Sequence, residues 1–178
     1  AIVWNLQTGE TQDQCSFYGR DRHWEPVNSV DISPDGTRLL TASDDGTTIV
    51  WAFEIGKACE PQLILPQHWD GYVSSAMFSA DGRRAVTAMG EEAMGYRGPR
   101  GDVSAQSWEG ILGFVMVWDF ESKTLRILPE TDPKNFAEFS MAGNRILTRS
   151  VSGVMVWNID NGTVLELNGT TGAMSFSP

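Results

Sequence analysis

Side chains that could perform acid–base or metal chemistry are few in this chain. His23 and His68 are its two histidines, and no serine lies in the Gly-x-Ser-x-Gly setting of a hydrolase nucleophile. Asp44 and Asp45 could act as paired carboxylates in hydrolysis, but a hairpin turn of composition Asp-Asp-Gly explains both. We expect both histidines to be structural, each joining buried polar groups, and the sequence predicts no catalytic residue, no bound metal and no cofactor.

Three short motifs point to other chemistry, and each has a simpler interpretation. The Gly-rich segment 91–112 has no Lys-Ser/Thr after its glycines, so it does not match a phosphate-binding loop. Its Arg-Gly-Asp at 100–102 is an adhesion-type tripeptide, but matches of three residues are common by chance. Asn-Gly-Thr at 161–163 and at 168–170 fits the glycosylation pattern, which applies only to a secreted protein, and a turn explains each.

Composition and charge limit the classes of partner. The chain has 13 Lys and Arg against 23 Asp and Glu, a net charge of −10. We expect neither nucleic acid nor an anionic membrane as partner, because both require clustered basic residues. Two cysteines, Cys15 and Cys59, cannot form a disulfide framework and have no metal-ligand spacing. No run of 18 apolar residues is present, so the sequence predicts no transmembrane helix. We expect a cytoplasmic protein. No feature of the sequence points to a small-molecule substrate.

Two phrases recur four times each and alternate along the chain. The first is a short apolar run that ends at a tryptophan, at Trp4, Trp51, Trp118 and Trp157. The second is an apolar run followed by a turn that begins at a serine, at Ser33, Ser79, Ser140 and Ser177. Such runs closed by turn residues are typical of β-strands, and no window indicates an amphipathic helix. The repeating unit is therefore four short antiparallel strands, which bury both faces of their sheet only by stacking on neighbours.

These phrases resemble the WD-repeat family of β-propellers. Trp118-Asp119 is the family's Trp-Asp dipeptide, and its variants are Trp4-Asn5, Trp51-Ala52 and Trp157-Asn158. The resemblance implies an all-β fold of four-stranded antiparallel blades, with strands a, b, c and d in chain order and the tryptophan on strand c. It also implies a buried hydrogen-bonded network in the best-matching unit, formed by His23, Thr41, Asp45 and Trp51.

Two other units depart from the family pattern. The unit that starts near His68 keeps Thr87 and Trp118 but has no Asp six residues before its tryptophan. The unit from about Pro133 has no histidine at all. We expect these two units to depend more on apolar packing than the first one.

The repeats divide residues 1–178 into one β-propeller segment with about three complete blades and two partial ones. The expected order is strands c and d at 1–12, then blades at 23–65, at 68–128 with the insertion 91–112, and at 133–167, and finally a strand a at 173–177. One possibility is a small four-bladed ring closed by the terminal strands. The other, which we favour, is a fragment of a larger ring, seven-bladed by family resemblance, since both ends of the chain read as the interior of a fold.

Alternating strand direction places the d-to-a and b-to-c connections at the same end of every blade. The insertion 91–112 therefore emerges beside the segments at His23 and His68. The expected partner-binding face consists of aromatic residues and arginines, the types enriched at protein interfaces: Trp24, Trp69, Tyr72, Tyr96, Arg97, Arg100 and Trp108. The competing interpretation is that the tryptophans pack under loops and the insertion has no binding role.

Three functions are compatible with these features. We expect a non-enzymatic scaffold that presents loops on the end face of a β-propeller to a protein or peptide partner. The alternative is the accessory propeller of a multidomain enzyme, of kinase or peptidase type, whose catalytic part lies outside this sequence. A propeller enzyme with carboxylates in a central channel ranks last, because the inner strands are apolar except for Asp31 and Glu138.

Overall fold

β-Strands dominate the computed structural model of this chain. The structure describes residues 3–4, 11–12, 15–19, 22–65, 71–90, 114–128, 134–150, 153–167 and 175–176. These residues contain no helix, and they form three four-stranded antiparallel sheets that follow one another along the chain. The prediction of an all-β fold made of four-stranded propeller blades is confirmed.

Each blade consists of four strands that are consecutive in the sequence and neighbours in the sheet. The first blade contains β3 (Val27–Ile32), β4 (Arg38–Ser43), β5 (Thr48–Ala52) and β6 (Glu60–Leu65). The second contains β7 (Tyr72–Phe78), β8 (Arg84–Gly90), β9 (Val115–Asp119) and β10 (Thr124–Leu128). The third contains β11 (Lys134–Phe139), β12 (Arg145–Ser150), β13 (Val154–Asn158) and β14 (Val164–Leu167).

The chain ends are described only in part. β1 (Val3–Trp4) and β2 (Thr11–Gln12) pair antiparallel ahead of the first blade, within the range expected for strands c and d. Of the strand expected at 173–177, only Ser175 and Phe176 lie among the described residues, and the structure assigns them no strand. The insertion 91–112 lies outside the described residues.

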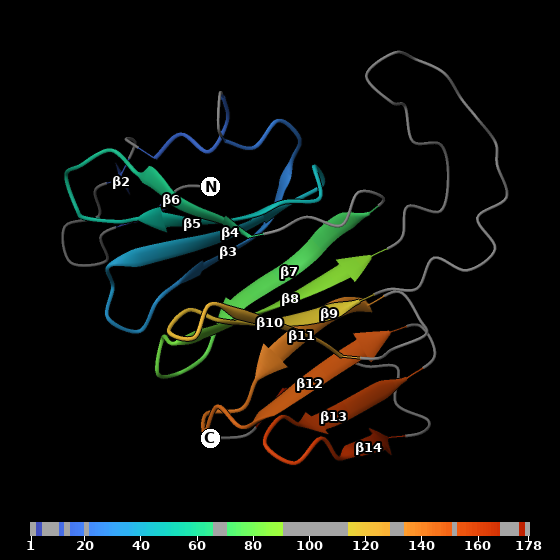
Figure 1. The fold of residues 1–178 in the computed structure, drawn as a ribbon. Helices are drawn as coiled ribbons and strands as arrows, with labels where there is room; N and C mark the ends of the chain where they lie inside the picture. Colours follow the sequence, from blue (N-terminus) through green and yellow to red (C-terminus); the bar gives the residue numbers. More distant parts are fainter. Residues whose placement is uncertain are drawn as a thin grey trace, which may run out of the picture.

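The blades are arranged around their first strands. Figure 1 shows the three sheets side by side, and β7 contacts both β3 and β11. The fourth strands, β6, β10 and β14, lie at the opposite edge of each sheet, where each pairs with a single strand among the described residues. The first strands therefore pack against neighbouring blades, whereas the fourth strands form the outer edges.

Apolar side chains on the middle strands hold neighbouring blades together. In β8, Ala85 and Met89 belong to the core shared with the first blade, whereas Val86 and Ala88 belong to the core shared with the third. Both faces of the strand are thus buried, and burial of a larger side chain such as Val86 or Met89 contributes about 1.5–3 kcal/mol. This explains why every residue of β8 after Arg84 is buried, with no alternation of buried and exposed positions.

The turn between the first two strands has the same construction in all three blades. The glycine N–H donates to the serine carbonyl at 2.8 Å in Ser33–Gly36, Ser79–Gly82 and Ser140–Gly143. The glycines have φ of 71°, 67° and 70°, a region that strongly favours glycine. The Ser-x-x-Gly spacing in the sequence therefore reports a real backbone requirement.

The two carboxylates of the inner strands connect neighbouring segments. Phe78 N–H in β7 donates to Asp31 Oδ2 in β3 at 2.7 Å. Phe176 N–H donates in the same way to Glu138 Oε1 in β11 at 2.8 Å. Both acidic side chains thus satisfy a backbone group of the following segment, which is a structural explanation for the charged residues on otherwise apolar inner strands.

Candidate functional site

His23 lies at the centre of a buried hydrogen-bonded network at one end of the first blade. Its Nδ1 lies 3.0 Å from Asp45 Oδ2, and its Nε2 lies 2.6 Å from Thr41 Oγ1. Trp51 Nε1–H donates to the same Thr41 hydroxyl at 2.7 Å. The structure therefore brings together all four residues that the family resemblance assigned to this network.

Both ring nitrogens of His23 are engaged in the network. The Asp45 carboxylate only accepts, so Nδ1–H of His23 donates to it, and Nε2 is hydrogen-bonded to the Thr41 hydroxyl. Thr47, which the sequence analysis did not include, donates its hydroxyl to Asp45 Oδ1 at 2.6 Å and lies 2.8 Å from His23 Nδ1. The sequence could have indicated Thr47, because it follows the turn aspartate by two positions. The carboxylate of a turn aspartate commonly accepts hydrogen bonds from the residue two positions later.

Several donors surround the Asp45 carboxylate. Its side chain is fully buried, and burial alone would raise its pKa. Hydrogen bonds from His23, from the hydroxyl and N–H of Thr47 and from the Trp24 N–H outweigh burial, so the pKa of Asp45 lies below its ordinary value of 3.8. The carboxylate is thus held ionised inside the fold.

The network has the atoms of a nucleophilic triad but not its accessibility. An aspartate, a histidine and a hydroxyl are aligned, as in hydrolases. Thr41 and His23 are both 0% exposed, and the Thr41 hydroxyl is occupied by the Trp51 N–H. A substrate carbonyl cannot approach this oxygen, so the arrangement holds β4, β5 and the segment at His23 together and does not open onto a reaction site.

The other blades contain parts of the same network. In the third blade Trp157 Nε1–H donates to Thr148 Oγ1 at 3.1 Å, so the Trp–Thr pair is retained without a histidine. In the second blade Thr87 Oγ1 and Trp118 Nε1 are buried and make no hydrogen bond within the described part of the chain. His68, the histidine expected for that blade, lies outside the described residues.

Two residues of the expected partner-binding face are described. Trp24 follows His23 and is 61% exposed, and its N–H donates to Asp45 Oδ2 at 3.1 Å. Tyr72 begins β7, and its ring occupies the space that a Cβ would need at Gly90, which explains the glycine there. Outside the described residues lie the remaining five: Trp69, Tyr96, Arg97, Arg100 and Trp108.

Asn28 joins the first two blades at the same end as Trp24. Its Nδ2 donates to Asp44 Oδ1 at 2.6 Å and to the Val73 carbonyl in β7 at 3.1 Å. Asp44 N–H in turn donates to the Pro26 carbonyl at 2.9 Å. The loop that carries Trp24 is therefore attached both to its own blade and to the next one.

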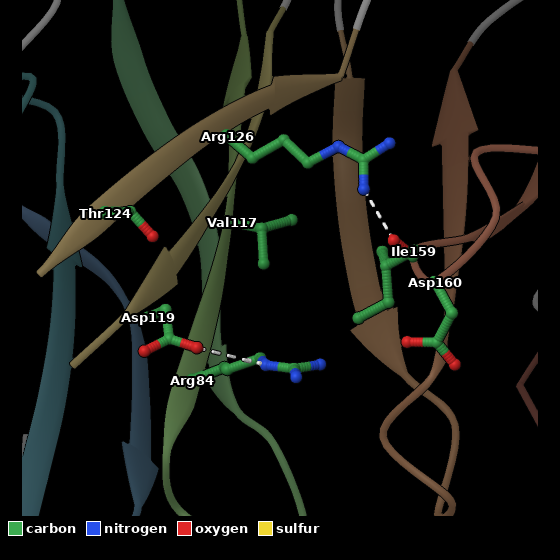
Figure 2. A pocket seen from close by; sticks show the side chains of 7 residues that line it. All are labelled: Arg84, Val117, Asp119, Thr124, Arg126, Ile159 and Asp160. Atoms are coloured by element: carbon green, nitrogen blue, oxygen red, sulfur yellow. Dashed lines mark hydrogen bonds and ion pairs between the residues drawn. The ribbon is translucent and has the colours of Figure 1, made fainter. Parts of the chain in front are cut away.

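A groove of about 160 Å³ separates the second and third blades at the opposite end (Figure 2). Arg84 and Arg126 extend into it from β8 and β10, and Ile159 and Asp160 line it from the turn after β13. Arg84 pairs with Asp119 at 3.4 Å, and Arg126 donates to the Ile159 carbonyl at 2.5 Å. Two arginines and two aspartates, Asp119 and Asp160, thus line this groove, which the sequence did not indicate.

The described residues hold no group of three or more His, Cys, Asp or Glu arranged to bind a metal ion. None of their elements is a helix long and apolar enough to cross a membrane. The structure does contain a disulfide between Cys15 and Cys59, 44 residues apart, which sequence reasoning did not propose. No local pattern links two cysteines at that separation, so only the fold brings them together.

Residues 15–52 match the sequence model of the family described as "WD40: WD domain, G-beta repeat". These residues include His23, Thr41, Asp45 and Trp51, the complete network.

Proteins similar to this chain carry related names. A stretch of 86 residues, 47% of the chain, is 36% identical to the beta-1 subunit of a guanine nucleotide-binding protein of Nicotiana tabacum and covers 21% of that protein. A stretch of 50 residues, 28% of the chain, is 36% identical to a subunit of chromatin assembly factor 1 of Schizosaccharomyces pombe and covers 10% of it. A stretch of 41 residues, 23% of the chain, is 51% identical to "WD repeat-containing protein 38" of Mus musculus and covers 13% of it.

The matched stretches thus span about a fifth or less of the length of these relatives. The repeat match, the names of the relatives and the three four-stranded antiparallel blades agree with one another. Residues 15–52 therefore carry a WD40 repeat, and the described residues form blades of a β-propeller.

Proposed function

We propose that the chain is a non-enzymatic scaffold that binds a protein or peptide partner at the blade end carrying Trp24 and Tyr72. The observation that supports this most directly is the 61% exposure of Trp24. Tryptophan is the residue type most enriched among energetic hot spots of protein interfaces, where its large surface becomes buried. Two of the similar proteins are, by name, subunits of larger assemblies, which agrees with a role in binding proteins.

The loop that presents Trp24 is held in place before any partner arrives. The Trp24 N–H donates to the buried carboxylate of Asp45, and Asn28 ties the same blade end to β7. A partner therefore does not have to order this loop, and less conformational entropy is lost on binding. An exposed side chain on a fixed backbone is what a rigid scaffold requires.

Charge near Trp24 favours a basic partner surface. Glu25 and Asp44 are both exposed at this end, and the whole chain carries a net charge of −10. Acidic groups beside an aromatic ring attract lysine or arginine side chains, whose cations also stack on tryptophan. The extension of this face to Trp69, Tyr96, Arg97, Arg100 and Trp108 stays a prediction.

The absence of enzymatic activity belongs to the same proposal. It is supported by the closed His23 network, whose buried hydroxyl group is already engaged by the Trp51 N–H. An accessory propeller of a larger enzyme, of kinase or peptidase type, stays the alternative, and the full-length reading frame would decide it. A cytoplasmic location also stays a prediction.

A peptide selection tests the proposed face. The whole chain is used to enrich binders from a displayed library of random peptides, and their affinity is then measured against Trp24→Ala. We expect the enriched peptides to be rich in Lys and Arg and to bind the variant at least about tenfold more weakly, the cost of losing a hot-spot side chain.

Met141→Ala is the matched control. Met141 is 69% exposed, but it lies in the Ser140–Gly143 turn at the opposite end of its blade. Its truncation should leave the affinity unchanged. Peptides that bind Trp24→Ala as tightly as the unmodified chain, or that lose affinity only with Met141→Ala, would refute the assignment of this face.

A further inference from the structure

The Cys15–Cys59 disulfide lies beside the buried tryptophan of the first blade. Cys59 directly precedes β6, so the bond closes a loop of 44 residues that contains β3, β4 and β5. The two Cα atoms are 4.7 Å apart, within the range of protein disulfides. Cys59 is 0% exposed and Cys15 is half-buried, so a reductant reaches the bond from the Cys15 side.

The described residues between 15 and 23, which we call the clasp segment, cover Trp51. Phe17 is 2% exposed and meets the Trp51 ring edge-on, with 5.1 Å between ring centroids. The Arg22 guanidinium carbon lies 5.3 Å from the centre of the same ring, and the guanidinium donates to the Cys59 carbonyl at 3.2 Å. The clasp segment therefore contributes both an aromatic and a cationic contact to the tryptophan.

The clasp segment also positions His23 for the buried network. The His23 N–H donates to the Phe17 carbonyl at 2.8 Å, and the Gly19 N–H donates to the His23 carbonyl at 3.2 Å. These bonds link His23 to a segment whose other end is fixed covalently at Cys15. Movement of Cys15 away from Cys59 would therefore disturb the imidazole as well as the cover of Trp51.

We propose that the Cys15–Cys59 disulfide is a redox-sensitive clasp. In the oxidised state it closes the clasp segment over Trp51. A dithiol reductant breaks the S–S bond: two electrons and two protons pass to the two cysteine sulfurs, which become thiols, and the dithiol becomes a disulfide. The segment then leaves Trp51, and His23 loses its fixed position beside Thr41 and Asp45.

The clasp has a consequence for the compartment in which the blade is closed. Disulfides persist in oxidising compartments and are rare in the reduced cytosol. The closed state therefore belongs to an oxidising environment, and in a reducing one the same chain holds the open state. In the cytoplasmic location expected from the sequence, the chain would hold the open state.

Thiol counting and hydrogen exchange on the whole chain test the clasp. Protein purified without reductant is alkylated and weighed, before and after treatment with dithiothreitol. We expect no alkylated cysteine before treatment and two after it. Amide exchange over residues 15–23 should become at least about tenfold faster on reduction, whereas exchange in β7 to β10 should not change, because the clasp is a local unit.

The variant Cys15→Ser/Cys59→Ser separates the clasp from other effects of the reductant. It should exchange rapidly over residues 15–23 under both conditions and show no response to dithiothreitol. If this variant does not fold, the comparison of oxidised with reduced unmodified protein still decides the question. Alkylation of both cysteines without reductant, or unchanged exchange over residues 15–23 after reduction, would overturn the proposal.

Discussion

The Thr41 hydroxyl accepts the Trp51 N–H at 2.7 Å and is hydrogen-bonded to His23 Nε2 at 2.6 Å. Thr41→Val keeps the shape of the side chain but removes both hydrogen bonds. Two buried polar atoms lose their partner, so we expect a loss of about 2–4 kcal/mol in the free energy of unfolding, from about 1–2 for each orphaned group. Urea unfolding followed by tryptophan fluorescence measures it.

Thr87→Val is the matched control, since Thr87 occupies the equivalent position in the second blade. Its hydroxyl is buried without a hydrogen bond in the described part of the chain, so the substitution removes none there. The loss of stability should be smaller than for Thr41→Val, because no hydrogen bond among the described residues is removed. Equal losses for the two variants would show that the network does not contribute to stability in the way described.

The lowered pKa values of the turn aspartates Asp35 and Asp81 lead us to expect that the stability of the folded chain depends on pH. Hydrogen bonds from the Ser33 hydroxyl and from Thr37 lower the pKa of Asp35 from 3.8 to about 2, and the Ser79 hydroxyl and the Arg83 N–H lower the pKa of Asp81. These carboxyls take up protons at a higher pH in the unfolded state than in the folded state. Their contribution to the free energy of unfolding is therefore complete above about pH 4 and is lost as the pH falls toward 2.

We therefore expect the melting temperature to fall as the pH is lowered through that window. Asp35→Asn/Asp81→Asn should melt at a lower temperature at neutral pH and show a smaller fall on acidification. Thermal melts at several pH values between 2 and 7 measure both effects. A slope that is the same in the variant would exclude these two carboxylates as its source.

At the scale of the elements, one position in the turn between the third and fourth strands carries a different residue type in the second blade. Lys123 has φ of 55° in the second blade, where the first and third blades have Gly56 and Gly162 with φ of 85° and 74°. A side chain at such a positive φ destabilises the folded state by about 1–2 kcal/mol. Replacing it with glycine removes this strain, but the greater entropy of glycine in the unfolded chain offsets about 0.5–1 kcal/mol of the gain. Lys123→Gly should therefore stabilise the chain by about 0.5–1 kcal/mol.

Chemical denaturation measures that gain, and Gly56→Ala provides the opposite change. The alanine should destabilise the first blade, because it introduces a side chain at a positive φ in open space, where no contact compensates for the strain. A loss of stability in Lys123→Gly would mean that the lysine makes contacts that outweigh its backbone strain.

The repeats predicted the strands because each one ends at a recognisable turn. The Ser-x-x-Gly phrase marks a turn that needs glycine at a positive φ, and the tryptophan phrase marks a large buried side chain. Both features can be recognised in a single sequence. The blade start expected at residue 23 was less informative, since residues 22–26 form the loop that delivers His23 and the first strand begins at Val27. Long-range partners such as Cys15 with Cys59 left no such trace.

At the scale of the whole molecule, the two junctions between blades are not equivalent. At the first, the Arg38 guanidinium carbon lies 5.2 Å from the Phe78 ring centre and 5.4 Å from that of Phe120, and the group donates to the Gly82 carbonyl at 2.7 Å. Register places Arg38 opposite Ala52, so its cross-strand neighbour supplies no carboxylate that would compete for the guanidinium.

At the second junction the equivalent arginine, Arg84, pairs with a carboxylate of its own blade. Arg84 lies opposite Asp119 in the sheet and pairs with it at 3.4 Å, while its bond to the Gly143 carbonyl is also 3.4 Å. Ile159 stands at the position that Phe120 has in the second blade, so this position offers the arginine no ring to stack on. The groove of Figure 2 lies at this junction.

Arg38→Met should therefore weaken the molecule more than Arg84→Met. The first variant loses two ring contacts and a charged hydrogen bond, for which we expect a loss of about 2–3 kcal/mol. The second should lose less than about 1 kcal/mol, as expected for a partly exposed ion pair with long bonds. Denaturant titrations of both variants measure the difference, and equal losses would contradict the inequality of the junctions.

The disulfide also determines how the first blade carries mechanical load. A pull applied to the chain before Cys15 passes through the S–S bond to Cys59 and bypasses β3, β4 and β5. The chain between the cysteines, which are 44 positions apart, then cannot lengthen, although as a free strand it would span about 150 Å. While the bond is intact the His23 network is shielded from tension, and reduction places it in the path of the force.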